Sequence, residues 1–446
     1  MNKFVSNINS IIEFTRDIEQ SAIAKEVMES AKQSILDWFS VCIAARTDNQ
    51  AMTIMEMVRG WKSTGRALGL DGSTGAASPI ALLNGALSHT LDFDDFHMNS
   101  VMHATGPIFS SVFSLGLDRD KTGMEIITAF ISGYEVGTNF GLNDVGMSLV
   151  KNGWHTTSIL GHISSAVSCA ALLKLDPLGL KHAIGFSAVQ SGGLIASSGT
   201  ISKALLVGKA AMSGVMAAEL AEKGGIAPIH LLDSADSGFL TTFMKNEEKP
   251  RLADLGHTWQ IFNNAFKPYP ACQLTHAAYD AAKNMGEKID VNSLKKIRAF
   301  VNPFALNIAK YRDPKSTLEA RFSINFCIAL GLLGYGAGLE DFSEIRIEDK
   351  RVQALLGSID MLGDESINRW SARLEVELKN GEIIYQPIIA ALGSQDRPMD
   401  WDDLEIKFIA ICEPIFGTRE ANNLLNALRN FEKTGALQEV VSIISQ

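Results

Sequence analysis

A short stretch from Asp92 to His103 concentrates side chains that can move protons. Between these two residues it also holds Asp94, Asp95 and His97. Carboxylates held close together in a partly dry site raise each other's pKa, and an imidazole is well suited to proton transfer near neutral pH. The stretch therefore predicts acid–base chemistry. The alternative is a solvated acidic loop that caps the next helix.

Other polar side chains stand where helices rich in small apolar residues are expected to begin. His155 precedes such a helix, and the partial positive charge of a helix N-terminus favours a neutral imidazole that can accept a proton. Lys203 follows the Gly199-Thr200 loop, where backbone N–H groups and an ammonium would cradle an anion. Taken alone, a capping or core histidine and a solvent-facing lysine explain these positions equally well.

Two later segments add further cations. Lys267 stands between a phenylalanine and a proline that restricts the backbone, and His276 follows nine residues later. Arg321 opens another apolar helix, where it could hold a carboxylate by two parallel hydrogen bonds or form a surface salt bridge. The combined set of lysines, histidines and carboxylates, without a nucleophilic serine or a metal-ligand spacing, predicts proton transfer on a small polyanionic substrate.

The elements that must position these residues change in character along the chain. Helical periodicity dominates from about residue 20 to 245 and returns from 401 to 444, whereas strand-like alternation appears at 297–301 and 372–378, the latter before an Asn380-Gly381 hairpin turn. A helix is expected over 318–333. We therefore expect a mainly α protein with a large helical domain at 1–267, onto which 396–446 packs, and a smaller α+β domain at 268–395.

Composition limits the partners. The 446 residues include 40 basic and 50 acidic residues, a net charge of −10 that disfavours nucleic acid or an anionic membrane as the main partner. Five scattered cysteines predict neither a disulfide framework nor a zinc site. No signal peptide or membrane-length apolar segment is expected, and no nucleotide-binding fingerprint is found. These features favour a cytoplasmic enzyme with a small-molecule substrate.

The order and spacing of these motifs resemble the MmgE/PrpD family, which includes 2-methylcitrate dehydratase, cis-aconitate decarboxylase and iminodisuccinate epimerase. The resemblance covers nearly the whole chain and rests on five segments: 84–95 with His103, Gly153-Trp154-His155, 199–203, 267–276 and 319–323. It implies a homodimeric lyase or isomerase without metal or cofactor, with a lid-like smaller domain and a small di- or tricarboxylate or related enolisable acid as substrate. It places the catalytic groups at Asp92, His103, His155, Lys203 and Lys267.

The chain departs from that family pattern at three positions that become apolar. Phe96 stands where a threonine or serine is typical, Leu206 replaces a histidine, and Phe326 replaces a tyrosine. The loop from Asp92 to His103 has the length found in epimerase-like members. These changes favour a less polar substrate, and the side chains expected to bind it are Phe96, His97, Thr200, His276, Arg321 and Phe326.

Two other functions fit parts of the sequence. The apolar replacements would suit a metabolite-binding protein that has lost catalysis. The Asp92-Phe93-Asp94-Asp95 segment also matches the DxDD acid motif of terpene-type cyclases, although 8% aromatic residues and the many cations argue against a polyprenyl substrate. Dehydration, decarboxylation and epimerisation all remain open, because each begins by stabilising a carbanion-like centre beside a carboxylate.

Overall fold

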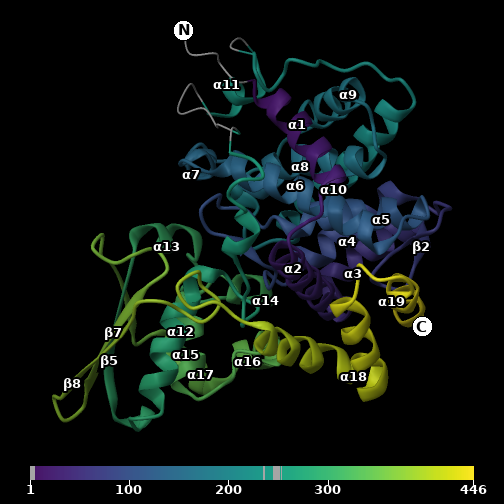
Figure 1. The fold of residues 1–446 in the computed structure, drawn as a ribbon. Coiled ribbons are helices and arrows are strands. Elements are labelled where there is room, and N and C mark those ends of the chain that lie inside the picture. The colour runs from purple at the N-terminus through teal and green to yellow at the C-terminus, as the bar shows by residue number, and fades with distance from the viewer. Residues whose placement is uncertain (1–5, 235–236, 245–251, 253) are drawn as a thin grey trace.

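The computed structural model describes residues 6–234, 237–244, 252 and 254–446. These residues form a large helical part and a smaller α+β part at one side of it (Figure 1). The mainly α fold class with a smaller α+β domain is confirmed. The buried apolar side chains form two large cores, one drawn from residues 8–266 and 399–444 and the other from 271–391. The predicted boundaries, 267/268 and 395/396, fall between these two sets.

Four long helices form the centre of the large domain: α4 (Ala77–Thr90), α5 (Thr105–Asp118), α8 (Thr156–Leu172) and α10 (Ile201–Glu222). Their small residues allow close packing. A Cβ added at Gly208 of α10 would lie 2.2 Å from the Leu82 carbonyl oxygen of α4, so only glycine permits this crossing. Around them lie α1 (Asn7–Gln20), α2 (Lys25–Ala44), α3 (Asn49–Gly60), α6 (Gly123–Gly141), α7 (Val145–Lys151), α9 (Pro177–Ala188) and α11 (Phe239–Met244).

Helix α10 is long and apolar enough to cross a membrane by length and composition, the one such helix among the described residues. The expectation of no membrane-length segment overlooked it. Of its most apolar window, 61% is buried inside the protein, and it packs against α4, α8 and α9. Burial among other helices accounts for its apolar composition.

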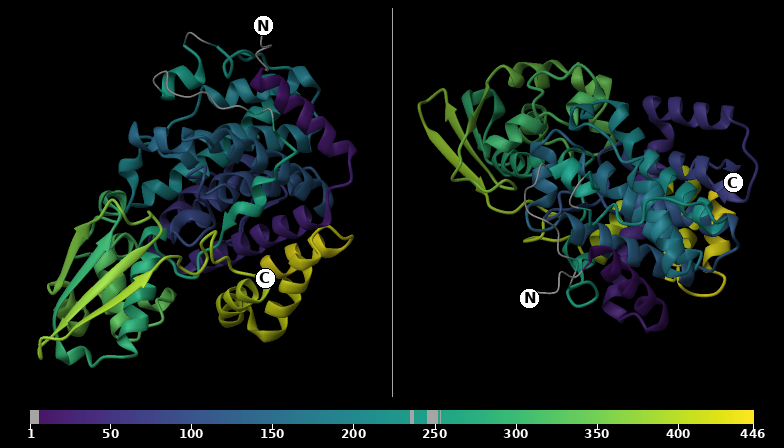
Figure 2. Two further views of the ribbon diagram at one scale, coloured as in Figure 1. Left: turned by 60° about the vertical axis from the view of Figure 1, so that its left-hand side comes forward. Right: turned by 90° about the horizontal axis from the view of Figure 1, so that it is seen from above.

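The smaller domain contains a four-stranded sheet in the order β6 (Ile359–Gly363), β5 (Leu294–Val301), β7 (Ala372–Leu378) and β8 (Ile383–Ile388). Only the β5–β6 pair is parallel. The helices α12 (Gln273–Gly286) and α15 (Ile324–Leu332) pack together beside the sheet (Figure 2). Strand β7 alternates buried and half-buried residues as its sequence predicts, and the hairpin at Asn380-Gly381 is present.

The helix expected over 318–333 is interrupted. Helix α14 (Thr317–Ala320) ends before Arg321, and α15 begins after Ser323, whose hydroxyl accepts a hydrogen bond from the Phe326 N–H at 3.1 Å. A serine at this position caps a new helix more readily than it continues an old one. The remaining short helices are α13 (Pro303–Ile308), α16 (Glu344–Ile347) and α17 (Lys350–Leu356).

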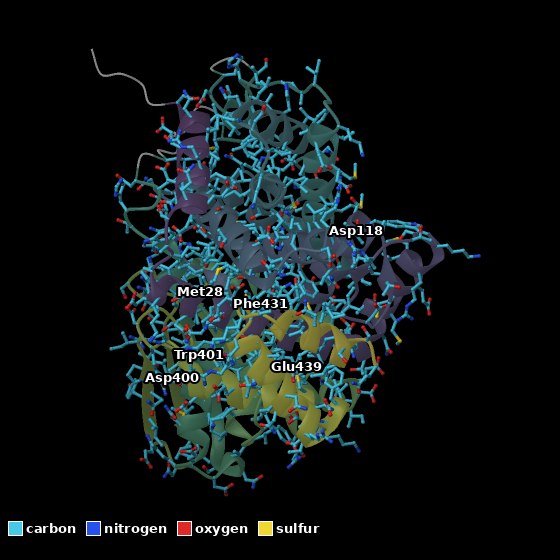
Figure 3. All side chains as sticks on the ribbon, turned by 45° about the vertical axis from the view of Figure 1, so that its right-hand side comes forward. Met28, Asp118, Asp400, Trp401, Phe431 and Glu439 are labelled. Atoms are coloured by element: carbon cyan, nitrogen blue, oxygen red, sulfur yellow. The ribbon has the colours of Figure 1, made fainter. Side chains whose placement is uncertain are left out.

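The C-terminal tail returns to the large domain. Helix α18 (Trp401–Arg429) packs against α2, and α19 (Ala436–Ile444) packs against α18. In Figure 3 these yellow helices lie in front of the ribbon, with Trp401 marking the start of α18. The backbone kinks at Gly417, which has a φ of +79°, three residues after Pro414. This return places a residue of α18 beside the site described next.

Candidate active site

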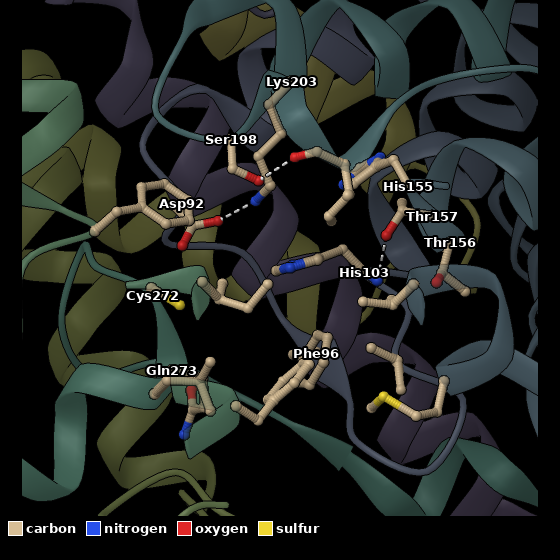
Figure 4. A pocket seen from close by; sticks show the side chains of 18 of the residues that line it. Asp92, Phe96, His103, His155, Thr156, Thr157, Ser198, Lys203, Cys272 and Gln273 are labelled. Carbon is tan, nitrogen blue, oxygen red and sulfur yellow. Dashed lines mark hydrogen bonds and ion pairs between the residues drawn. The ribbon is translucent and has the colours of Figure 1, made fainter. Parts of the chain in front are cut away.

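A pocket enclosing about 680 Å³, part of it open to solvent, lies between the two domains. Its lining combines residues from the large domain with residues from 272–274, 304–308, 322 and 370 of the smaller one (Figure 4). The structure brings five sequence-predicted catalytic residues and Phe96 to this pocket: Asp92, Phe96, His103, His155, Lys203 and Lys267.

Local backbone structure sets the position of Asp92. It follows the C-terminus of α4 with a φ of +49°, in the left-handed region that side chains other than glycine rarely adopt. Directly after residues 92–95, which we call the acid segment, β3 (Phe96–His97) pairs antiparallel with β4 (Asn264–Ala265). This short ladder brings the segment that follows β4, and with it Lys267, to Asp92 from 175 residues away.

Two ammonium groups hold the Asp92 carboxylate. Lys203 Nζ donates to Oδ1 at 2.5 Å, and Lys267 Nζ lies 3.3 Å from Oδ2 while donating to the Asp92 backbone carbonyl at 2.7 Å. Burial alone would raise the pKa of Asp92, but the charges of Lys203 and Lys267 outweigh it and hold the pKa far below its ordinary value. Asp92 is therefore ionised, and the three groups together carry one net positive charge.

The Asp94 carboxylate joins two imidazoles. Its Oδ2 lies 2.7 Å from His89 Nδ1 and 3.2 Å from His103 Nδ1. Burial opposes ionisation of Asp94, but the charges and hydrogen bonds of His103 and His89 hold its pKa well below the ordinary range. Burial in turn lowers the pKa of His103 to about 4, despite Asp94. His103 is thus neutral at pH 7 with Nδ1 turned to Asp94, which leaves Nε2 to accept a proton.

The expectation that the neighbouring carboxylates raise each other's pKa is wrong for Asp92 and Asp94, because cations or imidazoles surround each of them. It holds for Asp95, whose pKa is raised to about 7 by burial and by Asp37. Asp95 accepts hydrogen bonds from Thr105 and from Asn264 of β4 and does not line the pocket. It ties β4 to the acid segment.

The atoms of His89, Asp94 and His103 that could bind a metal lie within 4.8 Å of one another. This is the one such cluster among the described residues, and the sequence spacing did not predict it. Two imidazoles and a carboxylate are a donor set that transition metals accept. The contacts of Asp94 Oδ2 with both rings also explain the cluster without a metal, as one carboxylate shared by two imidazoles.

His155 lies at the N-cap of α8, as predicted. Burial and the nearby charge of Lys203 hold its pKa well below the ordinary value, so its imidazole is neutral. Its side chain lines the pocket, and its buried Nδ1 has no hydrogen-bond partner within the described chain. A neutral histidine with an unused ring nitrogen can donate to or accept from a bound substrate.

Three residues expected to bind substrate do not line the pocket. His97 is turned into the large domain, where Nδ1 lies 2.8 Å from the Ser100 hydroxyl. His276 lies 3.1 Å from the Ala271 carbonyl oxygen and packs against the Tyr269 ring. Phe326 is completely buried in the core of the smaller domain.

Thr200 and Arg321 line a separate small cavity behind Asp92 and Lys203. The Thr200 hydroxyl donates to the Ser197 carbonyl oxygen at 2.7 Å. The Arg321 guanidinium is buried, 3.6 Å from Asp48, with Nε and Nη1 unpaired within the described residues. The structure thus places this arginine next to the catalytic groups but outside the main pocket.

Sequence reasoning overlooked Lys407 of α18. Its buried Nζ donates to Asp37 Oδ1 at 2.7 Å and to the carbonyl oxygens of Phe93 and Lys267 at 3.0 Å each. It thereby holds the backbone next to Asp92 and that of Lys267 itself. The only signal in the sequence was a lysine on the apolar side of a helix.

The geometry also bears on the cyclase alternative. Of the three carboxylates in the DxDD segment, only Asp92 lines the pocket, and it is bound by two lysines. A cyclase acid must be protonated to start its reaction, whereas the low pKa of Asp92 keeps it ionised. The site therefore does not support a cyclase.

Comparisons with known proteins identify the family of this chain. The MmgE/PrpD N-terminal domain matches residues 9–252, and the MmgE/PrpD C-terminal domain matches residues 269–433. A cis-aconitate decarboxylase of Aspergillus terreus is 25% identical over 87% of this chain and 86% of its own length. A cis-aconitate decarboxylase-like protein, oryM, of Aspergillus oryzae is 21% identical over 96% and 95%, respectively.

The human cis-aconitate decarboxylase is 25% identical to this chain over 79% of the chain and 76% of its own length. The two family models together span most of the chain, and the second begins at residue 269, between the last residue of the first core before it, Phe266, and the first residue of the second core, Ala271. The chain belongs to the MmgE/PrpD family and is an enzyme of its lyase type.

Proposed function

We propose that the protein is a cofactor-independent lyase that removes CO₂ or water from a small enolisable carboxylic acid. The observation that carries the proposal is a single net positive charge, from Lys203, Lys267 and Asp92, beside two neutral imidazoles in one pocket. Such a site binds a carboxylate and stabilises negative charge that develops next to it. The similarity to decarboxylases over most of the chain supports the same reaction type.

His103 and the lysines divide the work. In dehydration, Nε2 of His103 takes the proton from the carbon next to the bound carboxylate and the electron pair forms the new double bond. The hydroxyl at the neighbouring carbon then leaves as water, with the proton returned by His103. In decarboxylation, the C–C bond to the departing carboxyl group breaks and CO₂ leaves, and the electron pair left on the carbon takes a proton that solvent supplies through the His103 imidazole. In both reactions, the lysines hold the retained carboxylate as charge develops beside it.

Metal independence forms part of the proposal, because the chemistry needs only the proton carrier and the two ammonium groups. The His89, Asp94 and His103 cluster makes this testable. Exhaustive chelation followed by metal analysis should leave the turnover number unchanged in metal-free protein. Restoration of a lost activity by one added divalent metal would refute metal independence and assign the cluster a metal.

A homodimer and a cytoplasmic location are further parts of the proposal. Support for the dimer comes from exposed apolar side chains on or next to the adjoining helices α9 and α10, namely Leu178, Val189, Leu194, Leu205, Leu220 and Ile226. A solvent-exposed surface of this kind is typical of a site of association. Light scattering on the purified protein should give twice the 48.3 kDa mass of the chain.

The test of the reaction is proton exchange in D₂O, followed by NMR over a panel of unsaturated and hydroxylated carboxylic acids. We expect exchange at the carbon next to one carboxylate, with release of CO₂ or formation of a double bond. His103→Gln should lower the rate by about 10²- to 10⁴-fold. His257→Gln, at an exposed position, serves as the matched control.

The binding-protein alternative predicts a different result in the same assay. Calorimetry would then show tight binding of a carboxylic acid, while its carbon-bound protons fail to exchange. If the His103→Gln variant still exchanges the proton, the protein is an enzyme but His103 is not the base in its mechanism.

A further inference from the structure

The pocket has two unlike halves. Its charged and imidazole side chains gather around Asp92, whereas the side towards the smaller domain and α7 is apolar. That apolar half is formed by Phe96, Met147, Val150, Phe304, Ile308 and Trp370. The Phe96 ring lies 4.9 Å from the His103 ring and 5.6 Å from the Trp370 ring, so the apolar half begins next to the proposed base.

The remaining polar residues of the lining are uncharged, and most of their hydroxyl groups already make hydrogen bonds within the protein. The Thr156 hydroxyl donates to the Gly146 carbonyl oxygen at 3.1 Å, and the Ser198 hydroxyl donates to the Ile195 carbonyl oxygen at 2.9 Å. Thr157 accepts the His103 backbone N–H at 3.0 Å. Gln273 offers an amide, which can hydrogen-bond a substrate oxygen but cannot neutralise a charge.

The charge balance of the pocket matches one carboxylate. Lys203 and Lys267 supply two positive charges and Asp92 removes one, while the low pKa values keep His103 and His155 neutral. The next cation, Arg321, lines the cavity behind Asp92 instead. A second carboxylate in the apolar half would lose its hydration without gaining a partner, which is costly.

We propose that the substrate has one carboxylate at its reacting end and an uncharged, apolar substituent that packs against Phe96 and Trp370. The inference rests on the proposed function and narrows it to dehydration of enolisable monocarboxylic acids with an alkyl or aryl group, because loss of CO₂ from such an acid would leave no carboxylate for the lysines to hold. Phe96, which replaces a smaller polar residue of the family pattern, and Trp370 of the smaller domain are then the specificity-determining residues.

A matched pair of substrates tests the inference. The acids 3-hexenoate and 3-hexenedioate have the same six carbons and the same double bond, and differ in a terminal methyl group against a second carboxylate. We expect kcat/KM for deuterium exchange at C2 to favour 3-hexenoate by about tenfold or more. Exchange that favours the dicarboxylate would overturn the inference and leave the proposed function intact. Absence of exchange from both acids and from the wider panel would overturn both.

A variant sharpens the result by adding the missing cation. Val150 is half-buried at the α7 side of the pocket, so Val150→Lys should fold and place an ammonium beside the apolar half. We expect the ratio of the two kcat/KM values to move about tenfold towards 3-hexenedioate. Ile345→Lys, 83% exposed on α16 and away from the pocket, should leave the ratio unchanged. An unchanged ratio in folded Val150→Lys would count against the inference.

Discussion

Two buried lysine–aspartate ion pairs lie close together in this protein. They differ in how many of the lysine's hydrogen-bond donors have a partner. Lys407 uses three donors, one for Asp37 and two for backbone carbonyls, and lies outside the pocket. Lys203 makes one hydrogen bond, to Asp92, and faces the pocket. A lysine ammonium has three donors. The Lys407–Asp37 pair, whose ammonium donors are all used, therefore stabilises the structure. The Lys203–Asp92 pair still has ammonium donors that can bind a ligand.

The two sites are also connected. Lys407 binds the carbonyl oxygen of Phe93, next to Asp92, and that of Lys267, whose own ammonium reaches Asp92. Burial lowers the pKa of Lys407 and raises that of Asp37, with each partner opposing the shift of the other. The comparison teaches that one ion pair positions the backbone from which the other is built.

The largest effect on activity is expected for Lys203→Met. Loss of one of two cations that stabilise the transition state should lower kcat/KM by about 10²- to 10³-fold. Lys267 still compensates Asp92, so the free energy of unfolding should change by only about 1 kcal/mol. Steady-state kinetics and urea unfolding measure both quantities. Lys209→Met, at an exposed position of the same helix, is the control, and equal activity in the two variants would contradict the division between the sites.

Lys407→Met should show the opposite pattern, with stability affected first. It leaves the buried Asp37 carboxylate uncompensated, and breaking a buried pair in this way costs about 3–5 kcal/mol of unfolding free energy. Urea unfolding measures the loss, against Arg419→Met as an exposed control on α18. The double variant Asp37→Asn with Lys407→Met should recover part of it, because the unpaired charge is gone. An unchanged free energy of unfolding in Lys407→Met would show that Lys407 does not stabilise the structure.

A smaller loss is expected for Gly208→Ala, which alters the distance between α10, which carries Lys203, and α4, which precedes Asp92. The new Cβ would lie 2.2 Å from a backbone carbonyl of α4, and such overpacking costs about 1–3 kcal/mol. Kinetics should show a fall in kcat/KM as well. Gly60→Ala, where a Cβ meets no atom within 4 Å, should not lower stability, and the same result for Gly208 would show that the crossing is looser than the structure has it.

The mildest test uses pH alone. Because the pKa of His103 is lowered to about 4, kcat/KM should be level from pH 8 to about 5 and should fall tenfold per unit below about 4 as the base is protonated. Six buried histidines have lowered pKa values, among them His97 and His162 at about 4, whereas Asp95 and Glu135 have pKa values raised to about 7. The histidines outweigh the two carboxyl groups, so the folded state binds fewer protons than the unfolded state between pH 6.5 and 4. Stability should therefore decline as pH falls through this window. A kcat/KM that declines below pH 6.5 in folded protein would contradict the low pKa of His103.

Much of the local structure could be predicted from the sequence. Alternation in 372–378 and the Asn380-Gly381 turn identified β7 and its hairpin, and the apolar run after His155 identified α8 with its N-cap. The prediction of one helix over 318–333 was wrong because Ser323 caps a new helix, which depends on a single hydrogen bond. Residue types identified His97 and His276 as candidate substrate-binding residues, and the comparison with the family pattern added Phe326. The direction in which each side chain points depends on packing, which the sequence does not give.

The sequence by itself determined the fold class and the two-part pattern of helices and strands, because periodicity is a local property, and its resemblance to the MmgE/PrpD family selected the five polar groups that line the pocket. Only the tertiary structure decided the charge states of these groups and the residues that they contact. The pKa of Asp92 depends on lysines 111 and 175 residues away, and the role of Lys407 depends on Asp37, 370 residues away. Electrostatic interactions and burial act through space, so neither can be read along the chain.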